Sequence, residues 1–179
     1  MKTTIFLAHP NLDASRVNSS LARAATQVDG VGIRHLYALY PDGTIDVAAE
    51  QKAAMEADRI VWQFPMYWFS IPPLLKAWMD DVLTYGWAYG TNGTALQGKE
   101  LLIAVSTGAR AEQYRHDEGA RFTVNELLAP LRATSNLIGT RLLNPFVTCG
   151  ALSITDEELL VATQAYAAAV ADPRREVLE

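Results

Sequence analysis

The sequence predicts a three-layer α/β domain, in which helices cover both faces of a five-stranded parallel sheet. Two observations predict this fold class. Short apolar runs of strand length recur along the 179 residues, and stretches with helical periodicity separate them. Parallel strands need such crossover connections, and the crossover helices cover the sheet on both faces. No linker, repeat or low-complexity segment interrupts the pattern, so we expect residues 1–179 to form one domain.

The first half of the chain supplies three strands and three helices. We expect strands at 3–8, 31–39 and 59–65, and helices at about 18–27, 47–57 and 74–86. Pro72 and Pro73 precede the third helix, where proline is tolerated because the first N–H groups of a helix lack partners anyway.

The second half supplies two more strands and two more helices. We expect strands at 101–107 and 141–149, the latter interrupted by Pro145, and helices at 122–137 and 156–170. Thr155 and Glu158 form a capping-box signature that opens the last helix. We expect the tail, 172–179, to be frayed.

Composition and charge restrict the class of protein. A net charge of −5 without a long basic run argues against nucleic-acid binding. The single cysteine, Cys149, cannot form an internal disulfide, and it shows no metal-ligand spacing with the three histidines. The apolar stretch before His9 is too short for a signal peptide or a membrane span, so we expect a cytoplasmic protein and no metal.

Five strands in this alternation suit the sheet order 2-1-3-4-5, with the first strand between the second and third. Ligands of such sheets bind beyond the carboxyl ends of the strands, at the switch point between strands one and three. The loops after Ala8, Phe64 and Thr107 therefore matter most.

The first loop is polar and leads into a helix N-terminus. It lacks G-x-G-x-x-G and G-x-x-x-x-G-K-[ST], but it carries His9, Ser15, Asn18 and Ser20. Free N–H groups and the positive end of the helix dipole make such a segment a phosphate cradle. The alternative is ordinary N-capping by Ser15 or Asn18.

The second loop carries large apolar side chains, Met66, Tyr67, Trp68 and Phe69, where a surface turn normally has Gly, Asn, Asp or Ser. A planar ligand such as an isoalloxazine needs flat walls and a few aimed N–H groups, which an aromatic turn supplies. The alternative is that these side chains pack under a neighbouring element.

The third loop begins at Ser106 and Thr107, where Gly108 permits close backbone approach. Tyr114 and His116 follow, and either could donate a proton, although each alone is more often a surface residue. His35 and Cys149 are interpreted as structural.

The segment QFPMYWFSIPPLLKAWMDDVL, followed by YGWAYG, resembles the signature of the NAD(P)H:quinone oxidoreductases of flavodoxin-like fold. The resemblance is strongest to short bacterial members, such as the ancillary proteins of glutathione-regulated potassium-efflux systems. AHPN, GTALQGKELLIAVSTG and LLAPLRAT extend it along nearly the whole chain.

The resemblance implies a flavin bound between the subunits of a homodimer. It places a first group of residues around the flavin phosphate, a second along the isoalloxazine, and a third at its N1/O2 edge. These groups are His9, Ser15, Val17, Asn18 and Ser20; Pro65, Met66, Tyr67, Trp68 and Phe69; and Thr107 and Gly108.

The resemblance also implies a catalytic role for Tyr114, with His116 as the nearest second catalytic candidate, because the family's histidine position is Ala120 here. A second departure is Ala109, where the family usually has another glycine. FMN is favoured over FAD because longer members hold the FAD adenosine with extra segments.

The implied reaction is a two-electron ping-pong transfer of hydride from NAD(P)H through flavin N5 to a quinone or similar acceptor. An alternative is a regulatory subunit that docks on a potassium-efflux antiporter at the inner membrane and uses its flavin as a redox sensor. A one-electron carrier is a third, less favoured interpretation. The aromatic residues Trp78, Tyr85, Trp87 and Tyr89 independently suggest a dimer surface, unless they belong to the core.

Overall fold

The computed structural model describes residues 1–173 and 175–178. Its parallel strands lie in the order β2-β1-β3-β4-β5. A sixth strand, β6, pairs with the second half of β4, whose first residues pair with β5. The predicted three-layer fold with the order 2-1-3-4-5 is therefore confirmed. The strands are β1 (Thr3–Leu7), β2 (Val31–His35), β3 (Arg59–Pro65), β4 (Glu100–Ser106), β5 (Arg141–Leu142) and β6 (Phe146–Thr148).

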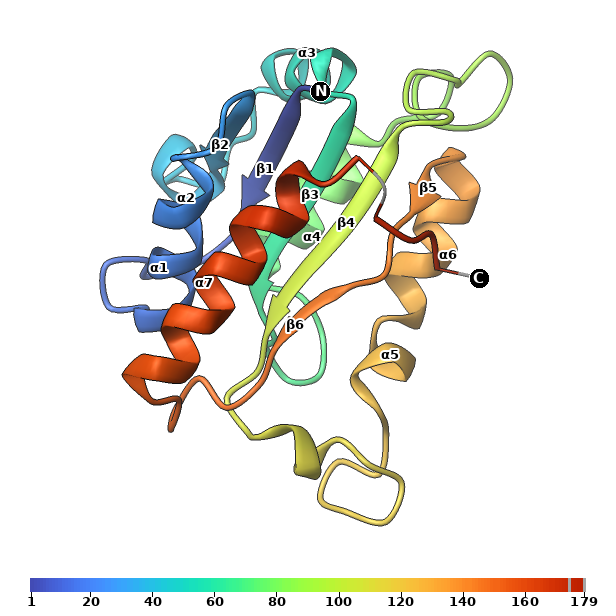
Figure 1. Cartoon of the computed structure of the whole chain (residues 1–179). Coiled ribbons are helices and arrows are strands. Elements are labelled where there is room, and N and C mark those ends of the chain that lie inside the picture. The colour runs from blue at the N-terminus through green and yellow to red at the C-terminus, as the bar shows by residue number, and fades with distance from the viewer. Residues whose placement is uncertain (174, 179) are drawn as a thin grey trace.

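Helices occupy the connections between these strands (Figure 1). They are α1 (Arg16–Ala25), α2 (Leu36–Leu39), α3 (Val47–Glu56), α4 (Pro73–Val82), the 3₁₀ turn η1 (Ala111–Gln113), α5 (Val124–Leu127), α6 (Ala129–Ile138) and α7 (Asp156–Ala171). No helix in the described part of the chain is long and apolar enough to cross a membrane.

Two hydrophobic cores lie on opposite faces of the sheet. One core joins the sheet to α1 and α7, which lie side by side in front of the strands in Figure 1. The other joins it to α2, α3, α4 and α6. The central strands β1, β3 and β4 are almost continuously buried because both their faces are covered. The parallel strands β1, β3 and β4 all run towards the lower edge of the view in Figure 1, so the loops that follow them meet there.

The strand predicted at 31–39 is shorter than expected. β2 ends at His35, and Leu36 begins the short helix α2. The register explains this difference, because His35 pairs with Leu7, the last residue of β1. Beyond that point the edge strand has no neighbour to bond with, and an apolar run this short does not distinguish strand from helix by its periodicity.

The helix predicted at 122–137 is divided in two. Thr123 caps α5, which is a single turn, and α6 begins at Ala129. Pro130 accounts for the break, since it lacks an N–H and is tolerated only in the first turn of a helix. The interruption predicted in the fifth strand is confirmed, because β5 and β6 flank Pro145 and both pair with β4.

The tail expected to be frayed includes residues 174 and 179, which lie outside the described residues. Of the rest, the Glu176 carbonyl accepts a hydrogen bond from the Asn144 N–H at 2.9 Å, and the Leu178 N–H donates to the Leu142 carbonyl at 2.8 Å. Residues 176–178 thus run antiparallel to the chain that follows β5.

Candidate functional site

Backbone hydrogen bonds join the loops at the carboxyl edge of the sheet. The Ala8 N–H donates to the Gln63 carbonyl at 2.9 Å, and the Met66 N–H donates to the Ser106 carbonyl at 2.7 Å. The Thr107 N–H donates to the Thr148 carbonyl at 2.9 Å. The three loops singled out in the sequence are therefore brought together, and the chain after β6 joins them as a fourth.

The N-terminus of α1 has the features of an anion site. Ser15 is the N-cap, and its hydroxyl accepts the Asn18 N–H at 3.2 Å. The N–H groups of Arg16 and Val17 donate to no atom of the described residues. N-capping by Ser15 is therefore confirmed. The phosphate cradle stays a prediction, with two N–H groups that have no acceptor in the described residues.

His9 is half-buried beside this helix end. Its Nδ1 lies 3.1 Å from the Asn11 N–H, which donates to it, so the neutral ring carries its proton on Nε2. Burial lowers the pKa of His9, and the neighbouring His35 lowers it further. His35 has a polar companion that the sequence did not reveal, because its Nε2 lies 3.1 Å from the His9 carbonyl oxygen.

The second loop is a two-residue turn with unusual residues. Tyr67 and Ser70 exchange backbone hydrogen bonds of 2.9 Å in both directions. Between them, Trp68 and Phe69 have φ values of 46° and 59°, as a type I′ turn requires. This left-handed region favours Gly and Asn and costs other residues about 1–2 kcal/mol each. Two bulky aromatic residues at these positions therefore strain the backbone of the turn.

The exposure of the turn agrees with a binding role. Trp68 is 94% exposed, and Tyr67 and Phe69 are also exposed, so the alternative in which these side chains pack under a neighbouring element is wrong for Trp68. The N–H groups of Trp68 and Phe69 donate to no atom of the described residues. Strain that places flat side chains and free donors at a ligand edge is typical of a functional site.

The third loop is held by the chain after β6. The Thr107 hydroxyl donates to the Ala109 carbonyl at 2.8 Å, which also accepts the Gly150 N–H at 2.7 Å. The N–H groups of Gly108 and Ala109 have no acceptor within the described part of the chain. Neither residue has a positive φ, so Ala109 fits this loop without the second glycine.

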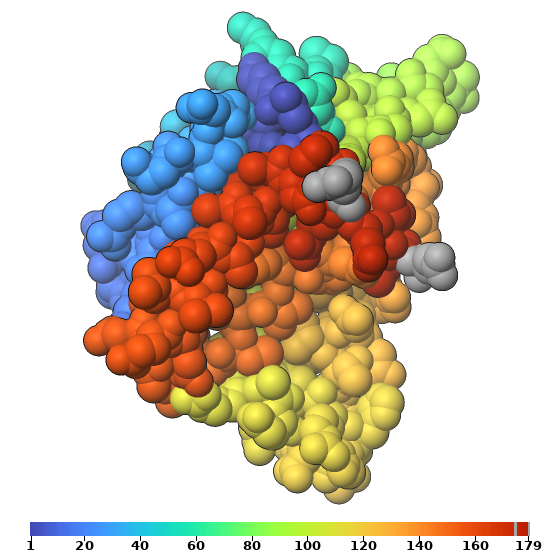
Figure 2. Space-filling model, viewed as in Figure 1, coloured from blue at the N-terminus to red at the C-terminus, as the bar shows by residue number. Residues whose placement is uncertain are grey.

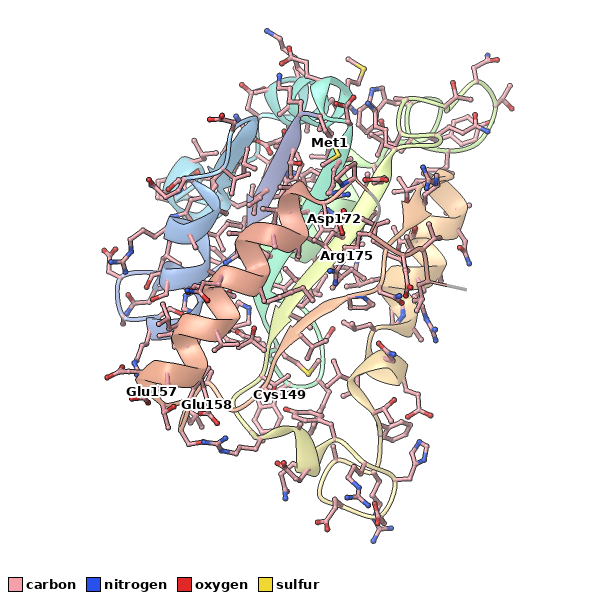
Figure 3. All side chains as sticks on the ribbon, in the orientation of Figure 1. Met1, Cys149, Glu157, Glu158, Asp172 and Arg175 are labelled. Atoms are coloured by element: carbon pink, nitrogen blue, oxygen red, sulfur yellow. The ribbon has the colours of Figure 1, made fainter. Side chains whose placement is uncertain are left out.

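Two arginines tie the loop between β6 and α7 to the site. Arg16 donates to Asp156 and to the Ile154 carbonyl. Arg110 pairs with Glu158 at 2.9 Å and donates to the Ser153 carbonyl. Glu158 and Cys149 both lie at the lower, carboxyl edge in Figure 3. This fourth loop was missed in the sequence, where Thr155 and Glu158 signal only a helix start.

The Arg110–Glu158 pair predicts a pH-dependent contribution to stability. The hydrogen bond from Arg110, together with the Thr155 N–H, lowers the pKa of Glu158 to about 2. A carboxyl whose pKa is lower in the folded protein stabilises it above the unfolded value of 4.5, and that contribution is lost as pH falls towards 2. We expect Glu158→Gln to lower the urea midpoint at pH 6 and to leave it unchanged near pH 2. Glu157→Gln, in the same turn, is the control, and an equal loss at both pH values would contradict the assignment.

Three predicted site residues lie outside the cluster of N–H groups at the edge of the sheet. Tyr114 is half-buried after η1, and its phenol has no partner among the described residues. His116 is exposed, and its Nε2 lies 2.9 Å from a carboxylate oxygen of Glu126, within the capping box of α5. Ser20 lies one turn into α1 and lines an open groove between α1 and α7.

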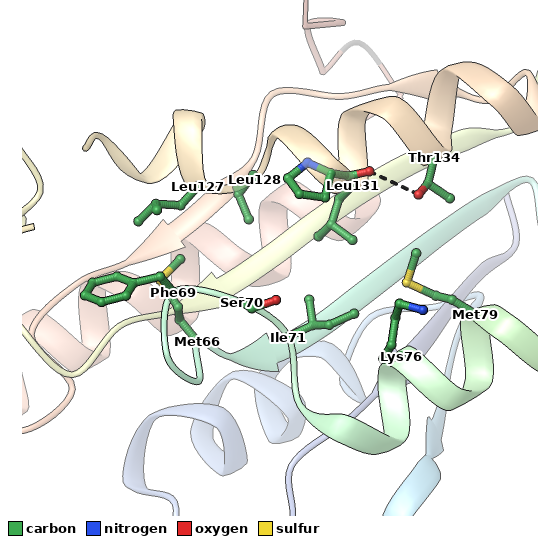
Figure 4. A pocket seen from close by; sticks show the side chains of 11 residues that line it. Met66, Phe69, Ser70, Ile71, Lys76, Met79, Leu127, Leu128, Leu131 and Thr134 are labelled. Atoms are coloured by element: carbon green, nitrogen blue, oxygen red, sulfur yellow. Dashed lines mark hydrogen bonds between the residues drawn. The ribbon is translucent and has the colours of Figure 1, made fainter. Parts of the chain in front are cut away.

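An apolar hollow of about 240 Å³ adjoins the aromatic turn (Figure 4). It lies between the turn, α4 and the α5–α6 segment. Met66, Phe69, Ile71, Met79, Leu127, Leu128 and Leu131 supply most of its walls, and Lys76 and Thr134 add polar groups. Figure 2 shows the yellow chain after β4 projecting beyond α7 at this end of the molecule. Within the described residues, no cluster of three His, Cys, Asp or Glu side chains could hold a metal ion.

The fold and the edge loops define a class of protein, and comparison with known sequences agrees. The chain belongs to the flavodoxin-like fold family, whose model matches residues 1–170. Within that class, its resemblance to the NAD(P)H:quinone oxidoreductases of flavodoxin-like fold is confirmed by named relatives and solved structures.

Two relatives illustrate the resemblance. The chain is 46% identical over 159 residues to the NAD(P)H oxidoreductase YrkL of Bacillus subtilis, covering 89% of this chain and 91% of the relative. It is 46% identical over 162 residues to the glutathione-regulated potassium-efflux system ancillary protein KefF of Klebsiella aerogenes, covering 90% of each.

Two solved structures are also similar. General stress protein 14 of Treponema denticola, in complex with FMN, superposes with a TM-score of 0.89 at 44% identity, covering 95% of this chain and 98% of that one. An NADPH-quinone reductase from P. pentosaceus superposes with a TM-score of 0.89 at 32% identity, covering 96% and 99%.

Proposed function

We propose that this protein is an FMN-dependent NAD(P)H:quinone oxidoreductase. The observation that carries the proposal is the strained turn at Trp68 and Phe69, which presents exposed aromatic rings and free N–H groups. This turn lies between the N-terminus of α1 and the loop after β4. Each of these two segments has two N–H groups without an acceptor in the described residues. A flavin mononucleotide needs these three features: a phosphate cradle, flat walls, and donors at the ring edge.

The cofactor assignment is supported from two sides. The similar general stress protein 14 was solved with FMN, and the relative YrkL is named an NAD(P)H oxidoreductase. The residues here fit FMN, with its phosphate at the start of α1 near His9 and its ring beside residues 65–69. When bound, the flavin would supply the redox chemistry, accepting hydride from NAD(P)H and returning two electrons to a quinone.

The protein itself would bind, orient and stabilise charge. The N–H groups of Gly108 and Ala109 would donate to the pyrimidine edge of the flavin, where reduction places negative charge. The Tyr114 phenol, which has no partner among the described residues, would add a further donor. The apolar hollow beside Phe69 offers a surface for an aromatic acceptor such as a quinone.

A homodimer is part of the proposal. Trp78 is fully buried, so it belongs to the core and does not support a dimer surface. Trp87 and Tyr89 are half-buried, but Tyr85 is 66% exposed and Trp68 is 94% exposed. Apolar side chains exposed to this degree favour burial against a second subunit. Sedimentation of the FMN-loaded protein would test this part.

The first experiment is spectroscopic. The purified protein is mixed with FMN, desalted, and treated anaerobically with NADPH and then with a quinone. We expect FMN to be retained, bleached by NADPH, and reoxidised by the quinone in repeated turnovers. Loss of FMN on desalting, or bound FMN that NADPH cannot reduce, would refute the oxidoreductase proposal.

A second candidate function is regulatory. The similarity to KefF, named as an ancillary protein of a potassium-efflux system, favours a chain that docks on an antiporter at the cytoplasmic face of the membrane. The two functions are compatible. The regulatory one would be supported by co-purification of the FMN-loaded protein with an antiporter encoded beside it.

The two catalytic candidates should differ in their effects. We expect Tyr114→Phe to slow anaerobic flavin reduction by NADPH about 10-fold. This is less than loss of a positioned general acid usually costs, because the N–H groups of Gly108 and Ala109 would remain as donors. His116→Ala should change it by less than about 2-fold, because Glu126 already holds this exposed ring in a surface pair. Stopped-flow absorbance gives both rates, and a larger loss for His116→Ala would reverse the assignment.

A further inference from the structure

A chain of buried hydrogen bonds crosses the core beneath the candidate site. It links Tyr166 of α7, Gln63 of β3, Asn18 of α1 and Ser106 of β4, and none of the four is more than 2% exposed. The Tyr166 hydroxyl donates to Gln63 Oε1 at 2.8 Å. Gln63 Nε2 donates to the Asn18 carbonyl at 3.1 Å, and Asn18 Nδ2 donates to Ser106 Oγ at 2.9 Å.

The direction of this chain is fixed by its chemistry. The main-chain carbonyl of Asn18 can only accept, so Gln63 must turn its amide N–H groups towards it and its Oε1 towards Tyr166. Gln63 Nε2 also lies 3.4 Å from Asn18 Oδ1, which leaves Asn18 Nδ2 to face Ser106. Burial raises the pKa of Tyr166 far above its usual range, so its phenol stays a donor. Every bond therefore donates towards Ser106.

The chain ends in a donor without an acceptor. Ser106 Oγ accepts the bond from Asn18, but its own proton donates to no atom of the described residues. Ser106 is the last residue of β4, its carbonyl accepts the Met66 N–H, and Thr107 follows it. The free O–H thus lies between the second and third loops of the site. A buried hydroxyl without an acceptor is costly, and a bound ligand can supply one.

We propose that Tyr166 and Gln63 are positioning residues for the cofactor, which act through Asn18 to hold the Ser106 hydroxyl as a donor to bound FMN. This inference rests on the proposed function. Successive hydrogen bonds of one direction polarise one another. The side-chain amide of Asn18 faces Gln63 with Oδ1 and donates to Ser106 from Nδ2, so it carries the effect of the bond made at Tyr166 to the Ser106 hydroxyl. Tyr166 of α7 is thereby coupled to the cofactor site through three hydrogen bonds.

A double-mutant cycle tests the coupling. FMN dissociation constants are measured by quenching of FMN fluorescence on the apoprotein for wild type, Tyr166→Phe, Ser106→Ala and the double variant. Phenylalanine keeps the ring that packs against Phe146 and removes only the hydroxyl. We expect Tyr166→Phe alone to weaken FMN binding about 3- to 10-fold. In the Ser106→Ala background the same substitution should change it by less than about 2-fold.

Tyr40→Phe is the matched control, because it removes another buried tyrosine hydroxyl that bonds to Glu50, in the opposite core. It should lower stability in urea and leave FMN affinity unchanged. If Tyr166→Phe does not fold, Gln63→Leu takes its place in the cycle. An equal effect in both backgrounds, or no effect in either, would overturn the inference while FMN binding and NADPH reduction of the wild type still supported the proposed function. A wild type that binds no FMN would overturn both.

Discussion

Replacing Glu50 with glutamine is expected to lower the free energy of unfolding by about 3–5 kcal/mol, the usual cost of removing one partner of a buried ion pair. Glu50 is fully buried on α3. One carboxylate oxygen accepts from Arg34 and Tyr40, and the other accepts from Trp78 Nε1 at 2.8 Å. The cluster joins β2, the residue after α2, α3 and α4 through this one side chain.

Glutamine has nearly the same shape but cannot replace these bonds. Its NH₂ group would face a donor in either orientation: Trp78 on one side, or Arg34 and Tyr40 on the other. Burial and the bond to Glu50 raise the pKa of the Tyr40 phenol, so it keeps its proton. Its oxygen can accept one amide N–H, but Arg34 has donors only and would still face the NH₂ group. The half-buried Arg34 would then lose its counter-charge. A total stability of about 5–15 kcal/mol makes this a large loss.

Urea unfolding of the apoprotein, analysed by linear extrapolation, gives the measurement. Glu56→Gln is the control, because Glu56 lies at the end of the same helix and its ion pairs within residues 1–173 and 175–178 are with the exposed Lys2 and Lys52. We expect the control to unfold close to the wild-type midpoint. If the two variants lost equal stability, the buried cluster would not be a main support of this face of the fold.

This cluster marks a limit of prediction from the sequence. The apolar runs predicted where the strands lie, with β5 and β6 as one interrupted strand, because burial of both sheet faces leaves a regular pattern. The order of the strands was predicted from their alternation with helices. Nothing in that pattern identifies Glu50 as buried. Its partners, Arg34, Tyr40 and Trp78, come from three other segments of the chain and lie close to Glu50 only after folding.

The same distinction applies to the site. The sequence pointed to the edge loops through residue types, such as the aromatic residues after β3 and the polar residues after β1. It could not show which N–H groups are free, because this depends on hydrogen bonds such as that between Ala109 and Gly150. The pair between Arg16 and Asp156 joins residues 140 positions apart, so the fourth loop left no local signal. The polar partner of His35 was missed for the same reason, since the His9 carbonyl lies 26 residues away in the sequence.

Replacing the aromatic turn with the residues that its geometry favours should separate stability from binding. Asn and Gly suit the two positive-φ positions of a type I′ turn, so Trp68→Asn with Phe69→Gly relieves strain of about 1–2 kcal/mol at each residue. Loss of the half-exposed Phe69 ring and the flexibility of glycine offset part of this gain. We expect the apoprotein to become more stable by about 1 kcal/mol in urea.

FMN binding should respond in the opposite direction. Loss of two aromatic contacts, each worth about 1.5 kcal/mol, should raise the FMN dissociation constant about 100-fold. Fluorescence titration of the same apoprotein preparations measures this change. A strained loop that is kept for binding predicts this combination: relieving the strain makes the protein more stable and weakens its binding of the ligand.

Arg121→Gly distinguishes strain relief from damage to the site. Arg121 is another exposed residue with a positive φ, 56°, but it belongs to a different loop, the one between η1 and α5. It should gain stability in the same way and keep its FMN affinity. If the turn variant bound FMN as tightly as wild type, Trp68 and Phe69 would not be walls of the flavin site. If the turn variant were instead less stable than wild type, the left-handed backbone at Trp68 and Phe69 would not be strained, and the argument from strain to binding would fail.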